Sequence, residues 1–121
     1  MYGLGIVRHM PNQVAELDRV FQALADPTRR SVVERLGAGP AATSELARSF
    51  TMALPSFTQH LGVLERSGLV ASQKLGRVRT YRLVPRPLET AEHWMVAQRQ
   101  TWERRLDQLD AFVRDLREEE R

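Results

Sequence analysis

The sequence predicts a mainly α-helical fold that carries one small β-hairpin. Apolar residues recur at steps of three and four over most of the chain, which is the period of an amphipathic helix. The segment 69–84 differs, because it has β-branched and aromatic residues around a glycine. The 121 residues fit one domain, and no apolar run approaches the ~20 residues that cross a bilayer. We therefore expect one small helical unit and no membrane partner.

The first two predicted helices meet at an aspartate followed by a proline. The first helix covers about residues 12–25 and has one apolar stripe. The stripe consists of Val14, Leu17, Phe21 and Leu24. The second helix should begin at Pro27, since Asp26 can accept a first-turn amide hydrogen and proline already has a helical φ. It should end near Leu36, because the glycines and proline in 37–40 favour a turn.

Two further short helices are predicted before the hairpin. Thr43 is a candidate cap for the third, and Glu45 would lie near the positive end of that helix. Pro55 marks the first turn of the fourth, which Ser67 and Gly68 end. The buried stripe of this fourth helix consists of Phe57, Leu61 and Leu64.

The hairpin and a long final helix complete the chain. In VASQKLGRVRTYRLV we predict a turn at Leu75 and Gly76, with packing by Val78, Tyr81 and Leu83. Pro85 and Pro87 should end the hairpin, and the last helix should begin at about Leu88. Its apolar residues step by four, three, four and three, which is a heptad seam flanked by charges. The seam consists of Trp102, Leu106, Leu109, Val113 and Leu116.

Charge divides the chain into a basic body and an acidic end. Residues 1–86 hold twelve Lys and Arg against six Asp and Glu, a net +6, whereas 87–121 hold six against nine, a net −3. A positive surface attracts the phosphates of nucleic acids. We assign 1–11 to an N-terminal extension that need not be ordered, 12–87 to a binding core and 88–121 to a dimerisation helix.

Several function classes are excluded by what the chain lacks. It has no cysteine, so disulfides, thiolate metal sites and cysteine nucleophiles are excluded. It also has no P-loop and no Gly-x-Ser-x-Gly motif, and its three histidines are scattered. MYGLGIVRHM has no long apolar stretch and does not read as a signal peptide. We expect a cytoplasmic protein that is not an enzyme and has no metal or cofactor.

The order of the elements is typical of a winged helix-turn-helix, in which a helix reads the major groove and a hairpin contacts the backbone. Gln can pair with adenine there, and Ser, Thr and His offer shorter contacts. The candidate reading residues are Ser56, Thr58, Gln59 and His60, beside or opposite the buried stripe. The hairpin contributes Lys74, Arg77 and Arg79 as candidate phosphate contacts, together with Arg82. The predicted partner is double-stranded DNA.

The chain resembles the ArsR family of bacterial repressors over roughly residues 14–117, in ALADPTRRSVVERL, TSELARSFTMALPSFTQHLGVLERSGLV and GRVRTYRLV. Members without an obvious metal site end in a helix similar to LETAEHWMVAQRQTWERRLDQLDAFVRDL. The resemblance implies a homodimer joined through the first and last helices, with the reading helices in successive major grooves. The apolar stripes on those two helices agree with it. The expected interface residues are Val14, Leu17, Phe21, Trp102, Leu106, Leu109 and Val113.

The sequence also departs from the family's pattern. Ala42 and Ser44 stand where metal sensors of the family carry a Cys-x-Cys pair. His93 has no second histidine at helical spacing. Ala53 stands where a serine usually caps the reading helix, and loss of such a cap costs about 1 kcal/mol.

Less specific interpretations remain open for several of these residues. His60 could face solvent, and the hairpin cations could only protect a strand edge from aggregation. Arg29 and Arg30 could fix the second helix and not touch DNA. Trp94 and Trp102 could line a pocket for an unknown small-molecule effector or simply form core. The whole chain could also be a protein-interaction module whose last helix forms a coiled coil.

Overall fold

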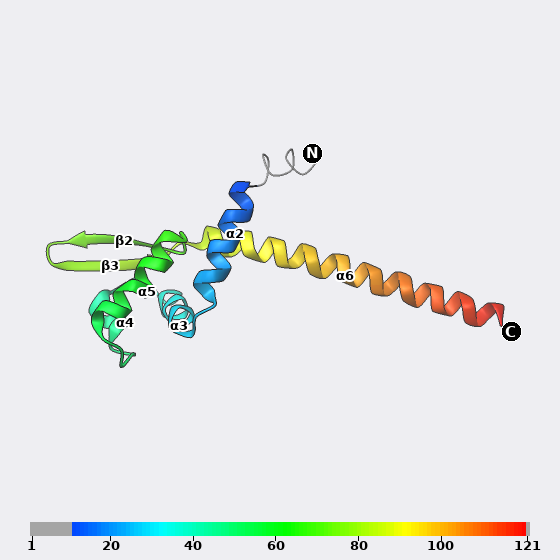
Figure 1. The fold of residues 1–121 in the computed structure, drawn as a ribbon, viewed down its shortest axis with the longest axis horizontal. Coiled ribbons are helices and arrows are strands. Elements are labelled where there is room, and N and C mark those ends of the chain that lie inside the picture. The colour runs from blue at the N-terminus through cyan, green and yellow to red at the C-terminus, as the bar shows by residue number, and fades with distance from the viewer. Residues whose placement is uncertain (1–10, 121) are drawn as a thin grey trace. The chain divides into compact units, whose positions relative to one another are not determined.

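The computed structural model describes residues 11–120 and has the predicted mainly helical fold with a small sheet (Figure 1). The chain divides after Ala91 into two compact units. The elements are α2 (Pro11–Leu24), α3 (Pro27–Leu36), β1 (Ala41–Ala42), α4 (Thr43–Ala47), α5 (Leu54–Arg66), β2 (Val70–Leu75), β3 (Val78–Leu83) and α6 (Pro85–Glu119). The expected extension 1–11 lies outside the described residues except for its last residue.

The core of the first unit forms where α2, α3 and α5 pack on one another and on the sheet. The stripe predicted for α5 is confirmed, because Phe57, Leu61 and Leu64 are fully buried. In α2 the deepest residues are Val20 and Ala23, both of which the predicted stripe omitted. The predicted stripe borders this buried face. Its members Leu17, Phe21 and Leu24 pack partly against the core, whereas Val14 is 49% exposed.

The predicted helix cap is confirmed for α3 and is wrong for α4. Asp26 caps α3 as predicted, since its carboxylate accepts a hydrogen bond from the Arg29 amide at 3.0 Å. The prediction that Thr43 caps α4 is wrong, because Thr43 is already the first helical residue and Ala42 is the cap. Glu45 supports this start from the helix side: its Oε1 accepts a hydrogen bond from the Ala42 amide at 3.1 Å. That reciprocal half of a capping box needs no hydroxyl at the cap.

The hairpin belongs to a three-stranded antiparallel sheet with strand order β1-β3-β2. Gly76 lies in the turn between Leu75 and Val78 and has a φ of +63°, a conformation that favours glycine. Tyr81 is buried as predicted, but Val78 is 52% exposed, so its predicted packing is wrong. The reason is position: Val78 pairs with Leu75 at the far end of the hairpin, beyond the reach of the core. The third strand, β1, pairs with Tyr81 and Thr80 and was not predicted.

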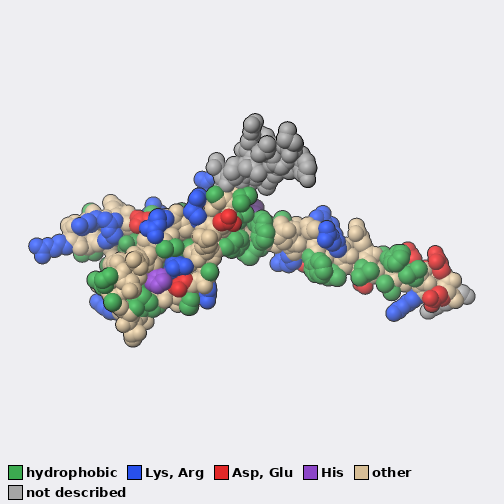
Figure 2. Space-filling view, in the orientation of Figure 1, with side chains coloured by type: hydrophobic (Ala, Val, Ile, Leu, Met, Phe, Trp, Pro, Cys, Tyr) green, Lys and Arg blue, Asp and Glu red, His purple; other side chains and the backbone are tan. Residues whose placement is uncertain are grey.

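Helix α6 begins at Pro85, three residues before the predicted start, and continues to Glu119. Pro85 and Pro87 were expected to precede the helix, yet both lie in its first turn. Proline is tolerated there because first-turn amides have no partner within the helix. The second unit is the part of α6 from Glu92 onward. Its large apolar side chains are exposed along the helix (Figure 2). They are Trp94, Met95, Trp102, Leu106, Leu109, Phe112, Val113 and Leu116.

Candidate nucleic-acid interface

Helix α5 presents polar side chains near its start while it buries its apolar stripe. Ser56, Thr58 and Gln59 are exposed, and Phe57 between them is fully buried. The hydroxyl of Thr58 donates a hydrogen bond to the Pro55 carbonyl oxygen at 3.0 Å. Because its one hydrogen is used, this hydroxyl can only accept a further hydrogen bond. The cap residue of α5 is Ala53, whose side chain makes no capping hydrogen bond. The three exposed residues predicted as readers therefore share an accessible stretch of helix.

His60 is held differently from the other predicted readers. Its side chain is only 24% exposed, and its Nδ1 lies 3.0 Å from Nη1 of Arg29. The same nitrogen lies 3.7 Å from the carboxylate of Asp26. His60 is therefore less exposed than the other predicted readers, and its contact with DNA stays a prediction. Arg29 has the structural role that the sequence left open, because it also donates hydrogen bonds to two carbonyl oxygens of α2.

Asp26 carries a perturbed pKa in this cluster. Partial burial of its carboxyl acts to raise the pKa. The hydrogen bond from the Arg29 amide, the charges of His60 and Arg29, and the Thr28 amide act in the other direction and outweigh burial. The pKa of Asp26 therefore lies below its ordinary value. The carboxylate is ionised at neutral pH, as a helix cap near the positive end of α3 should be.

Cationic side chains gather over the hairpin (Figure 2). Lys74 and Arg77 are exposed near its turn. Arg79 is also exposed but is anchored, because its Nη1 donates a hydrogen bond to the Ser72 hydroxyl at 2.8 Å. That hydroxyl in turn donates to the Glu65 carboxylate of α5 at 2.7 Å. The chain of contacts ties both strands of the hairpin to the helix that carries the candidate readers.

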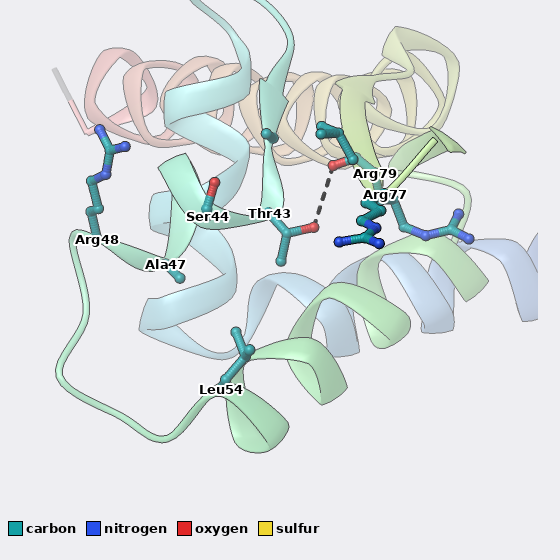
Figure 3. A pocket seen from close by; sticks show the side chains of 9 residues that line it. Thr43, Ser44, Ala47, Arg48, Leu54, Arg77 and Arg79 are labelled. Carbon is teal, nitrogen blue, oxygen red and sulfur yellow. Dashed lines mark hydrogen bonds between the residues drawn. The ribbon is translucent and has the colours of Figure 1, made fainter. Parts of the chain in front are cut away.

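A groove of about 540 Å³ lies between α4, the start of α5 and β3 (Figure 3). The hydroxyl of Thr43 donates a hydrogen bond to the Arg79 carbonyl oxygen at 3.4 Å, and this bond links the α4 wall of the groove to the β3 wall. Its lining residues are Ala42, Thr43, Ser44, Ala47, Arg48, Leu54, Arg77, Val78 and Arg79. The Ser44 hydroxyl and the guanidinium groups of this groove can donate hydrogen bonds to phosphate oxygens.

Sequence reasoning named Arg77 and Arg79 but missed the rest of this groove. Thr43 was considered only as a helix cap, and Ser44 only as a position without a thiolate. Arg48 follows α4 directly and had no distinguishing neighbour in the sequence. Only the packing of β1 and α4 beside β3 brings these side chains to the hairpin. The one signal in the sequence was the basic excess of residues 1–86.

Among residues 11–120, no group of three or more acidic, histidine or cysteine side chains is arranged to hold a metal ion. None of the helices over these residues combines the length and the apolar character needed to cross a membrane.

Comparison with known proteins gives a consistent result. A helix-turn-helix domain family matches residues 24–73. The HTH-type transcriptional regulator Rv2034 of Mycobacterium tuberculosis is 50% identical over 68 residues, which are 56% of this chain and 64% of that protein, so the match spans less than two thirds of its length. The transcriptional repressor SdpR of Bacillus subtilis is 29% identical over 66% of this chain and 89% of its own.

Solved structures extend the likeness over most of the fold. The crystal structure of an ArsR family transcriptional regulator, RHA00566, is 49% identical, with a TM-score of 0.70 over 77% of this chain and 93% of that chain. An ArsR-like transcriptional regulator from Rhodococcus sp. RHA1 is 33% identical, also with a TM-score of 0.70, over 81% of this chain and 92% of its own. These proteins are transcriptional regulators by name, and none is named as an enzyme.

Proposed function

Because this chain belongs to the ArsR family of winged helix-turn-helix transcriptional regulators, we propose that it binds operator DNA as a homodimer and represses transcription. Helix α5 enters the major groove, and the β2–β3 hairpin follows the phosphate backbone. Repression is proposed because SdpR, which this chain matches over 89% of SdpR's length, is named as a repressor. A DNA partner implies that the protein works in the cytoplasm.

The observation that carries this proposal is that Arg48, Arg77 and Arg79 line a groove that also includes Leu54, at the exposed start of α5. Gln59 is the residue best suited to base recognition, since its amide can bond two atoms of adenine at once. Ser56 and Thr58 add shorter contacts to base edges or phosphates. Lys74 and Arg77 contact phosphates without reading sequence, so they contribute affinity and orientation.

The dimer is proposed from the apolar surface that the second unit leaves exposed. Leu106, Leu109 and Val113 are 45%, 58% and 38% exposed, and they share one heptad seam with Trp102 and Leu116. Such a contiguous apolar surface marks an interface in a protein of this size. In the first unit, Val14 and the partly buried Leu17 and Phe21 are proposed to contribute from α2. A two-fold dimer then requires an operator with two inverted half-sites.

A selection experiment tests the function. Wild-type protein is incubated with a pool of random duplexes, and bound sequences are recovered and sequenced. We expect an imperfect inverted repeat with half-site centres about one helical turn apart, or ~34 Å. Gel shifts with that duplex at two salt concentrations should show that the binding affinity falls steeply as salt rises, because phosphate neutralisation releases counterions. Recovery of no enriched motif, together with salt-independent binding, would contradict the proposal and favour a protein-interaction module built on the exposed seam of α6.

A further inference from the structure

Three polar side chains, two from the start of α3 and one from α5, meet in the first unit. Asp26 caps α3, Arg29 lies in the first turn of α3, and His60 lies on α5. The imidazole Nδ1 is 3.0 Å from the Arg29 guanidinium and 3.7 Å from the Asp26 carboxylate. Arg29 is thus the hydrogen-bond partner of His60, and the Asp26 carboxylate lies near the same ring nitrogen. All three side chains are partly buried.

The guanidinium of Arg29 connects two helices through one rigid plane. Its Nε donates to the Ala23 carbonyl oxygen at 2.7 Å, and its Nη2 donates to the Gln22 carbonyl oxygen at 3.0 Å. These oxygens belong to the last turn of α2, where helix carbonyls lack partners within the helix. The remaining Nη1 reaches His60 of α5. Any displacement of α5 relative to the end of α2 must therefore bend or break this contact.

In the neutral imidazole, the direction of the hydrogen bond fixes which ring nitrogen carries the proton. A guanidinium has donors only, so Nδ1 of His60 has to accept the hydrogen bond through its lone pair. The ring proton is then on Nε2, because a neutral imidazole carries its proton on one nitrogen. The ring is consequently held both in orientation and in tautomer. In sequence, His60 lies between the exposed Gln59 and the fully buried Leu61.

We propose that Arg29 is a positioning residue for DNA reading, which holds α5 in register through the Nε2–H tautomer of His60. The inference rests on the proposed function and assigns His60 to this support, acting on DNA through the position of its helix. A reading side chain such as Gln59 must be held within about 0.5 Å to make a bidentate contact with a base. Contacts from the hairpin to phosphates tolerate more displacement, because they depend mainly on charge.

Arg30 provides a matched control for this proposal. It is the next residue of α3, carries the same charge, and its Nη1 also donates to an oxygen at the end of α2, that of Leu24 at 2.8 Å. Its side chain is on the same short helix but is bonded to α2 and not to α5. Loss of Arg30 therefore reproduces the loss of charge and of an α2 contact without the loss of the link to His60.

The test measures the affinities of four variants for two duplexes, namely the one that wild type selects from a random pool and an unrelated one of equal length. Arg29→Met and His60→Ala should lower the ratio of specific to non-specific affinity about ten-fold, whereas Arg30→Met should leave it within about two-fold. His60→Asn should keep most of the ratio, because its side-chain oxygen can accept from Arg29. Nitrogen-15 NMR of the histidine ring should report the Nε2–H tautomer in wild type and Arg30→Met, and a mixture in Arg29→Met.

Equal affinity ratios for Arg29→Met and Arg30→Met, or an unchanged His60 tautomer in Arg29→Met, would overturn the proposal. If Arg29→Met does not fold, His60→Ala decides, because it leaves every contact between Arg29 and α2 in place. Failure of the proposed function is distinguishable, since wild type would then select no duplex. The NMR arm still decides in that case whether Arg29 sets the state of His60.

Discussion

The hydroxyl of Thr43 donates a hydrogen bond to the main-chain oxygen of Arg79, 3.4 Å away, and so connects the start of α4 with the strand that leaves the hairpin turn. The same strand is tied to α5 through the contacts of Arg79 with Ser72 and of Ser72 with Glu65. The hairpin is therefore supported from two helices, through contacts of Arg79 and Ser72. Its turn, by contrast, carries exposed side chains.

Gln59→Ala should weaken binding to the selected operator by about 1–3 kcal/mol and leave non-specific binding almost unchanged. The physical reason is loss of a bidentate contact to a base by a residue that is exposed and contributes nothing to the core. Gel-shift titrations with operator and random duplex measure both affinities. Gln100→Ala in α6 removes the same kind of side chain from an exposed position and should keep the wild-type operator affinity. An unchanged operator affinity for Gln59→Ala would remove Gln59 from the readers.

Arg77→Ala should weaken specific and non-specific binding about equally and make the salt dependence shallower by about one unit of slope. Arg77 is exposed beside the turn and lines the groove, so it can contact a phosphate. The slope is obtained from affinities at four or more salt concentrations. Arg104→Ala removes the same charge from α6, a helix that is not proposed to contact DNA, and should keep the wild-type slope. Identical slopes for all three proteins would exclude a phosphate contact.

Asp26 should make folding stability depend on pH in the acid range. Its pKa is lower in the folded protein than in the unfolded chain, so its contribution is present above the unfolded value, about 3.9, and is lost as pH falls through the folded value. Asp26→Asn keeps a capping side chain but removes the charge. Denaturant unfolding at several pH values should show wild type more stable near pH 7 and the difference closing below about pH 4. A constant difference over that range would refute a role for the charge.

Replacement of Leu106 and Leu109 by Glu should abolish dimerisation and high-affinity operator binding together. Both side chains are about half exposed in the single chain, and a dimer would have to bury the new carboxylates without partners. Sedimentation velocity and a gel shift on the double variant measure the two properties. Gln108→Glu adds one charge between these positions and should have little effect. A monomeric double variant that binds the full operator as tightly as wild type would show that this seam is not the dimer interface.

Arsenite, zinc and peroxide should leave the DNA complex intact at stoichiometric concentrations. The chain has no cysteine, so it can form neither a thiolate metal site nor a disulfide. A gel shift with each agent, and mass spectrometry under native conditions, test the prediction. Release of DNA by arsenite with one ion bound per protomer would contradict it.

The parts of the fold that could be predicted are those that a local pattern determines. The buried stripe of α5, the cap at Asp26 and the turn at Gly76 each depend on residues within one or two turns of chain. The strand Ala41–Ala42 is too short to show any period, and it exists because Tyr81 and Thr80 offer it a partner. The start of α6 was missed because proline breaks a helix interior but is tolerated in its first turn.

The candidate site divides in the same way. Exposure of Gln59 and Thr58 followed from their position beside a buried stripe, and the sequence alone predicted it. The engagement of His60 by Arg29 joins residues 31 positions apart and depends on how α3 packs against α5. The groove between α4 and β3 likewise depends on packing between distant segments. Contacts of this kind leave no periodic trace in a single sequence.

The exposed turn of the hairpin makes part of this protein free to change during evolution. Leu75 and Val78 are 71% and 52% exposed, and Lys74 and Arg77 beside them are exposed as well. Substitutions at such positions usually change folding free energy by less than about 0.5 kcal/mol. New variants of the turn can therefore arise one substitution at a time while the protein stays folded. A gene duplicate could acquire a different overall affinity for DNA here long before its core diverged.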